Sequence, residues 1–285
     1  MPNRALFAHD PADWYRLKAC CFMPATAHRE SFETFDRCKT RVMRGGSGAP
    51  LLFLHGAGGA GTWLPFMEQL STRFDVIVPE HPGFGGSDTP DWLDNIGDLA
   101  YFYLDVIELL RLDGVHLVGT SLGGWIAAEL AVRSCARLKS LVLSAPAGIH
   151  VKGLRKGDVF MWSPEETIRR LYHDQTFAEA ALQRSASEAD QVTLMKNRLT
   201  MAKLAWQPRL HNPQLKKWLH RISVPTLILW GDKDQLLPPQ YGPAFAQAIP
   251  SARLEIIADC GHLPQIERVD TWVGKILAFA EEVGS

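Results

Sequence analysis

The 285-residue sequence has few cysteines, no excess of charge of either sign and no long apolar run. Its five cysteines, Cys20, Cys21, Cys38, Cys135 and Cys260, form no Cys-x-x-Cys pair and show no metal-ligand spacing. A net charge of −1 gives no electrostatic reason to expect binding to nucleic acid or to an anionic membrane. No window approaches the roughly 18 to 20 apolar residues of a membrane-spanning helix. A small molecule is therefore the expected partner, and no metal or other cofactor is indicated.

The N-terminal region lacks the features of an export signal. Asp10 and Asp13 interrupt any apolar stretch that follows Arg4. We therefore expect a cytoplasmic protein whose thiols stay reduced. Residues 1–30 show no regular pattern and are interpreted as an N-terminal arm. Residues 31–48 are interpreted as an antiparallel edge hairpin whose glycine-rich end, residues 45–48, forms a flexible tip.

From residue 50 onward, short apolar runs alternate with segments of helical periodicity. Residues 95–111 repeat apolar side chains at the i, i+3, i+4 spacing of a helix, and the last helix is expected at about 269–282. Such alternation predicts an α/β fold: a mostly parallel central sheet flanked by helices. The expected strands occupy residues 51–54, 76–78, 115–118, 141–143, 226–230 and 254–257.

One long segment breaks this rhythm. Residues 149–222 contain many helix formers and no convincing strand, and the sequence Ser163-Pro164-Glu165-Glu166 is typical of a helix start. We predict that this segment is a helical cap inserted between two strands of the sheet. The core domain would then comprise residues 31–148 and 223–285.

The sequence Gly119-Thr120-Ser121-Leu122-Gly123 lies between a strand-like and a helix-like run. A serine at such a sharp strand-to-helix turn stands clear of the sheet, and the helix N-terminus behind it favours developing negative charge. Glycines suit a strained turn that the neighbouring backbone passes closely. Ser121 is therefore the candidate nucleophile; the alternative is a tight turn with an incidental serine.

A nucleophilic serine needs a base and a carboxylate that orients the base. His262 follows a late expected strand and comes after a glycine, so it is the candidate base. Asp234 lies in the loop after the strand at 226–230 and is the candidate acid, with Asp232 as its rival. The carboxyl ends of parallel strands meet at one edge of a sheet, so the three groups are expected to gather there.

Backbone amides are the expected donors to the oxyanion. One is the amide of Leu122, directly after the candidate nucleophile. The other is expected in the glycine-rich loop at residues 55–59, from Ala57, with Gly58 as the next choice. This loop lacks the Lys-Ser/Thr of a phosphate-binding loop and the spacing of a dinucleotide fingerprint.

Taken together, these motifs resemble those of the lid-bearing α/β-hydrolases, a family that includes esterases, lactone hydrolases and carbon–carbon bond hydrolases. The resemblance implies an α/β-hydrolase fold, a cofactor-free enzyme and a cap that serves as a lid. The matching motifs, in family order, are residues 55–59, 82–87, 119–124, 230–234 and 261–262.

Several residues differ from those typical of particular branches of this family, and these differences argue against those branches. Epoxide hydrolases and haloalkane dehalogenases of this fold carry an aspartate at the elbow, and dienelactone-type relatives carry a cysteine, whereas this chain has Ser121. Meta-cleavage carbon–carbon hydrolases share the serine and a cap segment like residues 168–174. They usually carry an arginine after the acid and a tryptophan after the histidine, where this chain has Gln235 and Leu263.

We therefore predict a serine hydrolase that cleaves a small, largely apolar ester or lactone through an acyl-enzyme. The expected substrate-binding residues are Gly58, Trp162, Tyr172 and Leu263. Three alternatives stay open: a carbon–carbon hydrolase that uses the same triad, a ligand-binding homologue with a vestigial triad, and a cofactor-free oxygenase or perhydrolase. The oligomeric state is also open, with a homodimer as one option.

Overall fold

The structure, a computed structural model, describes residues 28–184 and 187–284. The expected N-terminal arm therefore lies almost entirely outside the described residues. Eight strands form one sheet in the order β1-β2-β4-β3-β5-β6-β7-β8. The strands are β1 (His28–Phe35), β2 (Cys38–Gly46), β3 (Ala49–Leu54), β4 (Phe74–Pro79), β5 (Val115–Thr120), β6 (Leu138–Ser144), β7 (Thr226–Gly231) and β8 (Ala252–Ile257).

Strands β3 to β8 are parallel, and β1 and β2 form an antiparallel hairpin at one edge. The expected position of the hairpin tip is wrong. The chain reverses at Asp36 and Arg37, both with positive φ, whereas the glycine-rich segment connects β2 to β3. A Cβ on Gly46 would lie 2.3 Å from the Ser71 carbonyl oxygen. Close packing, rather than flexibility, therefore explains the glycine at this position.

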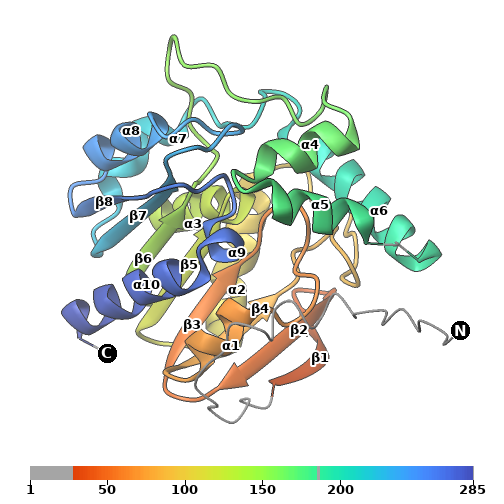
Figure 1. Ribbon diagram of the computed structural model, residues 1–285. Helices are drawn as coiled ribbons and strands as arrows, with labels where there is room; N and C mark the ends of the chain where they lie inside the picture. Colours follow the sequence, from red (N-terminus) through yellow and green to blue (C-terminus); the bar gives the residue numbers. More distant parts are fainter. Residues whose placement is uncertain (1–27, 185–186, 285) are drawn as a thin grey trace, which may run out of the picture.

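Helices cover both faces of the sheet (Figure 1). The faces alternate along β3, because successive side chains of a strand point to opposite sides. Leu51 and Phe53 pack with α1 (Pro65–Ser71) and α10 (Val269–Val283), whereas Leu52 and Leu54 pack with the helices of the other face. Those helices are α2 (Ile96–Leu109), α3 (Leu122–Arg133) and α8 (Tyr241–Ala248). The predicted α/β architecture is thus confirmed.

Between β6 and β7 the described chain forms helices and no strand of the sheet. These are α4 (Pro164–Leu171), α5 (Gln175–Gln183), α6 (Glu188–Ala205), α7 (Leu215–Trp218) and the 3-10 turn η2 (Leu219–Arg221). Figure 1 shows α4, α5 and α6 gathered at one end of the sheet. We call residues 149–222 the cap. As the sequence predicts, Ser163 begins α4: its side chain accepts a hydrogen bond from the Glu166 amide.

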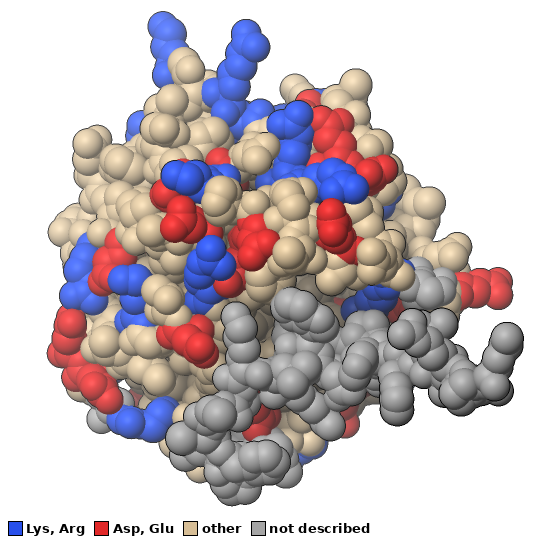
Figure 2. Space-filling view, viewed as in Figure 1, with Lys and Arg blue, Asp and Glu red and all other residues tan. Residues whose placement is uncertain are grey.

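The surface carries both signs of charge. Figure 2 shows acidic and basic side chains intermingled over the visible face, in keeping with a net charge of −1. Across the described residues, every helix is too short or too polar to cross a bilayer.

Candidate active site

Ser121 occupies a strained turn between β5 and α3. Its φ of 53° and ψ of −111° lie outside the regions that side-chain-bearing residues ordinarily adopt. The glycines around it are required by close approach: a Cβ on Gly123 would lie 2.0 Å from the Leu54 carbonyl oxygen. A Cβ on Gly119 would lie 2.3 Å from the Gly123 carbonyl oxygen. The turn therefore needs glycine at both positions, because a side chain at either one would collide with a backbone oxygen.

The structure brings Ser121, His262 and Asp234 together in one hydrogen-bonded chain. The His262 Nε2 atom lies 2.9 Å from Ser121 Oγ, and its Nδ1 atom lies 2.7 Å from Asp234 Oδ2. His262 and Asp234 are 2% and 5% exposed, whereas Ser121 is partly accessible. Burial keeps water from competing for the histidine–aspartate bond. A partly accessible hydroxyl backed by a fixed imidazole is an arrangement that can perform nucleophilic chemistry.

The two aspartates left open by the sequence have different partners. The Oδ1 atom of Asp234 accepts the Leu236 and Leu237 amides at 2.9 and 2.8 Å, which leaves Oδ2 facing the imidazole. Asp232 instead accepts the Cys260 amide at 3.2 Å and pairs with Lys233. Of the two carboxylates, the one that contacts His262 is therefore Asp234.

The two amides expected to serve the oxyanion belong to segments that adjoin Ser121. Leu122 is the first residue of α3, and the loop containing Ala57 passes beside the elbow, where a Cβ on Gly56 would lie 3.6 Å from Ser121 Cβ. Within the described part of the chain, neither the Leu122 nor the Ala57 amide donates to another protein group. Free amides beside a nucleophile are the groups that can stabilise an oxyanion.

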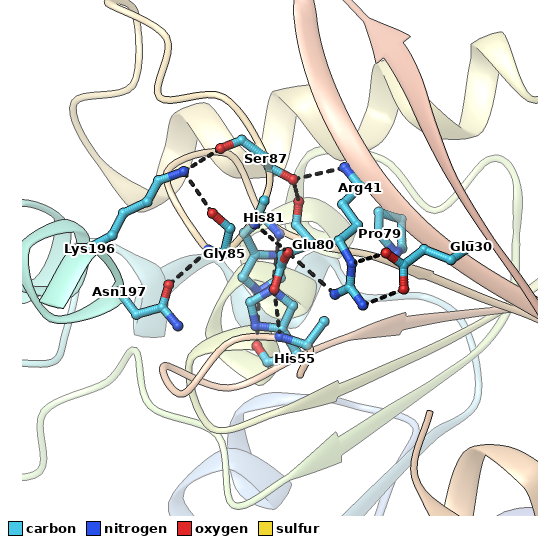
Figure 3. Close-up of polar contacts among 12 residues, drawn as sticks. Glu30, Arg41, His55, Pro79, Glu80, His81, Gly85, Ser87, Lys196 and Asn197 are labelled. Carbon is cyan, nitrogen blue, oxygen red and sulfur yellow. Dashed lines mark hydrogen bonds and ion pairs between the residues drawn. The ribbon is translucent and has the colours of Figure 1, made fainter. Parts of the chain in front are cut away.

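A stacked histidine pair supports this loop, and sequence reasoning assigned it no role. The rings of His55 and His81 lie 3.5 Å apart, and His81 Nε2 lies 2.8 Å from the His55 carbonyl oxygen (Figure 3). The His81 amide donates to His55 Nε2 at 2.9 Å. Burial lowers the pKa of His55 to about 4 and holds the pKa of His81 well below its ordinary value. Both rings are therefore neutral near pH 7, and the pair fixes the start of the loop.

Glu267, at the end of α9 (Pro264–Glu267), is a second group that sequence reasoning missed. One carboxylate oxygen accepts the Gly261 amide at 2.6 Å, and the other accepts the His173 and Asp174 amides at 2.8 Å. The His262 amide also donates to the Leu171 carbonyl oxygen at 2.8 Å. The loop that carries the imidazole is thus fastened to the cap. No local pattern singles out Glu267, because its partners lie in distant segments.

The expected substrate-binding residues differ in their surroundings. Trp162 packs on Gly157, with the Arg170 guanidinium 4.8 Å from its ring, and Tyr172 stacks on Phe177. Gly58 is exposed and Leu263 is half-buried. A surface hollow lies beside α4 and is lined by Ser163, Glu165, Glu166, Arg169, Arg170, Gln175 and Gln235. That hollow contains none of the four residues, so their contact with substrate stays a prediction.

The sequence pattern that defines the alpha/beta hydrolase family matches residues 51–274. Lipase 1 of Psychrobacter immobilis is 28% identical over 82% of this chain and 77% of its own length. The 2-hydroxy-6-oxo-6-phenylhexa-2,4-dienoate hydrolase of Comamonas testosteroni is 29% identical over 79% of this chain and 85% of its own. A solved membrane phospholipase A superposes with a TM-score of 0.77 at 26% identity, over 90% of this chain and 86% of that one. The motif match and the shared fold lead to one conclusion: the chain belongs to the alpha/beta hydrolase family and is a hydrolase.

Proposed function

We propose that the protein is a serine hydrolase that cleaves a small, largely apolar carboxylic ester or lactone. The observation that carries the proposal is the hydrogen-bonded chain from Ser121 through His262 to Asp234. The two hydrogen-bond distances suit proton transfer from a serine nucleophile to a histidine base. The free amides of Ala57 and Leu122 complete the arrangement as donors to the oxyanion.

Ser121 Oγ attacks the substrate carbonyl carbon while His262 Nε2 takes the hydroxyl proton. The carbonyl oxygen gains the negative charge, and the amides of Ala57 and Leu122 donate to it. When the tetrahedral intermediate collapses, the carbon–oxygen bond breaks and the imidazolium returns its proton to the leaving alcohol. A water molecule, activated by His262 in the same way, then attacks the acyl-enzyme and releases the acid. Asp234 holds the imidazole tautomer and stabilises the imidazolium.

The relatives include an ester hydrolase and also support a second candidate. One relative is a lipase, and the Comamonas relative is a hydrolase of a dienoate, so a carbon–carbon hydrolase with the same triad is that second candidate. Two residues favour the ester. Gln235 and Leu263 stand where the carbon–carbon hydrolases usually carry arginine and tryptophan.

A fluorophosphonate probe followed by intact-mass measurement tests the nucleophile. The wild type should gain a single adduct, and Ser121→Ala, which removes only the hydroxyl, should gain none. Hydrolysis of a panel of p-nitrophenyl esters and lactones, measured beside a vinylogous 1,5-diketone, then separates the two substrate classes. Turnover by Ser121→Ala at the wild-type rate would overturn the proposal. A wild type that binds these compounds without turnover would support the ligand-binding alternative.

A further inference from the structure

Three polar side chains of the cap helix α6 point onto loops of the core. Lys196 Nζ donates to the Gly85 and Ser87 carbonyl oxygens at 2.9 and 2.5 Å, and Thr200 Oγ1 donates to the Gly83 carbonyl oxygen at 2.6 Å. Figure 3 shows Lys196 and Asn197 reaching from the helix toward Gly85 and Ser87. Thr200 follows Lys196 by four residues and Asn197 by three, so all three side chains lie on the same side of α6.

Asn197 differs from its two neighbours because it also reaches the oxyanion loop, residues 55–60. Its Nδ2 donates to the Gly58 carbonyl oxygen at 2.9 Å, and its Oδ1 accepts the Gly85 amide at 2.8 Å. The residue is 3% exposed. A Cβ on Gly59 would lie 2.7 Å from Asn197 Nδ2, so the loop backbone is in direct contact with the carboxamide.

The oxyanion loop is held at both ends, and a turn closes its middle, where the Gly59 amide donates to the Gly56 carbonyl oxygen at 3.1 Å. His81 Nε2 holds the His55 carbonyl oxygen at one end, and Glu80 Oε1 accepts the Ala60 amide at 3.3 Å at the other. A Cβ placed on Gly58 would meet no heavy atom within 4 Å. The bond from Asn197 to the Gly58 carbonyl oxygen, one residue after Ala57, is the contact by which α6 supports this turn. The same turn carries the Ala57 amide, which must point at the oxyanion.

We propose that Asn197 is a positioning residue through which the cap holds the oxyanion loop in its reactive conformation. The inference rests on the proposed function, since it assigns the Ala57 amide to the oxyanion. The carboxamide suits this role because it donates to one loop and accepts from the other. An aspartate would turn a carboxylate oxygen toward the Gly58 carbonyl oxygen, and a leucine would remove both the donor to Gly58 and the acceptor for the Gly85 amide. The packing of α6 on the core and the conformation of the oxyanion loop therefore depend on each other.

The test compares Asn197→Leu and Asn197→Asp with Thr200→Val as the matched control. The control also removes a bond between α6 and a core loop, but leaves Gly58 held. Hydrolysis of p-nitrophenyl acetate gives kcat and KM. The ratio of inhibition constants for a trifluoromethyl ketone and its methyl ketone reports the oxyanion site, because the fluorinated ketone binds as a charged hemiketal.

Both Asn197 variants should lower kcat about tenfold or more, with KM changed less than about threefold, since complete loss of an oxyanion donor costs about 10²–10³-fold. The preference for the trifluoromethyl ketone should fall by a similar factor. Thr200→Val should stay within about threefold of wild type in kcat and in this preference. A merely structural role would lower the thermal midpoint of all three variants and leave the ketone preference unchanged.

Asn197 variants that keep the ketone preference of Thr200→Val would overturn the inference. If Asn197→Leu does not fold, Asn197→Asp, which preserves the side-chain shape, decides the question alone. Failure of the proposed function would look different. The wild type itself would show no preference for the trifluoromethyl ketone. Ser121→Ala would then give the same ratio of inhibition constants as the wild type.

Discussion

The carboxylate of Glu267 lies 2.8 Å from the backbone amide of His173, although 94 positions separate them in the sequence. The same side chain accepts the Gly261 amide at 2.6 Å, one residue before His262. It is 5% exposed and therefore depends on these amides for its polar partners. One buried carboxylate thus joins the cap to the loop of the candidate base.

Replacing Glu267 by glutamine should destabilise the protein and slow turnover. The glutamine amide group would turn a donor toward one of the amides that the carboxylate now accepts, leaving a buried N–H unpaired. We expect a loss of about 1–3 kcal/mol in the free energy of unfolding, measured by urea denaturation. The control is Glu281→Gln, which breaks an exposed ion pair with Arg73 and should cost less than about 1 kcal/mol. Equal losses in the two variants would contradict the bridging role.

Asp234→Asn and Asp232→Asn should affect catalysis very differently. Asparagine at 234 can present a donor to His262 Nδ1 and favour the wrong imidazole tautomer. Because a triad with the wrong tautomer cannot accept the serine proton, we expect kcat to fall on the order of 10³–10⁴-fold. Asp232 contacts Cys260 and Lys233 instead, so its variant should keep kcat within about tenfold. Steady-state kinetics of both variants measure the difference, and a larger fall for the Asp232 variant would reverse the assignment.

Alanine substitutions at two glycines should change stability in opposite directions. Gly123→Ala would place a Cβ 2.0 Å from the Leu54 carbonyl oxygen and should destabilise the elbow by several kcal/mol. Gly274 lies within α10, and a Cβ there meets nothing within 4 Å. Gly274→Ala should therefore stabilise the protein by about 0.5–1 kcal/mol. Thermal denaturation distinguishes these outcomes, and a stable, active Gly123→Ala would show that the elbow tolerates a side chain.

The buried histidine pair should make stability depend on pH. Burial lowers the pKa of His55 to about 4 and that of His81 in the same direction, so the unfolded chain binds more protons between about pH 6.5 and 4. The stability that the neutral rings contribute is fully present above pH 6.5 and is lost as the pH falls through this window. For His55 alone the full loss is on the order of 3 kcal/mol. Urea denaturation at pH 7.0 and 5.5 measures the first part of this stability loss. At these pH values most carboxylates are still ionised and do not contribute to the change.

A matched variant identifies the source of this pH dependence. His220 is exposed, and its ring nitrogen contacts the Lys217 carbonyl oxygen within its own turn. His220→Gln should therefore keep the pH slope of the wild type, whereas His55→Gln should reduce it. The same slope in both variants would assign the effect to other groups.

Much of the fold follows from local pattern. Short apolar runs predicted the six parallel strands. Most of these strands are buried on both faces and so have few polar residues, whereas β8, at the edge of the sheet, is more exposed. The hairpin tip was misplaced because glycines at 45–48 indicate a turn as readily as close packing. Its actual turn at Asp36 and Arg37 carries only a weak signal, since neither residue is a glycine.

Sequence alone was enough to predict the α/β architecture and the placement of Ser121, Asp234 and His262 after strands β5, β7 and β8. Both depend on short-range patterns: continuous apolar runs, helical spacing and residues directly after a strand. The catalytic roles of these three residues stay a proposal.

Which polar groups meet across long separations depends instead on how the chain packs in three dimensions. The fold places Asp234 rather than Asp232 against His262, and it brings Asn197 to Gly58 and Glu267 to His173, 139 and 94 positions apart. The last two contacts depend on how the cap packs on the core. Burial then makes each one specific, because an unpaired polar group away from water costs more than a bond to the right partner gains.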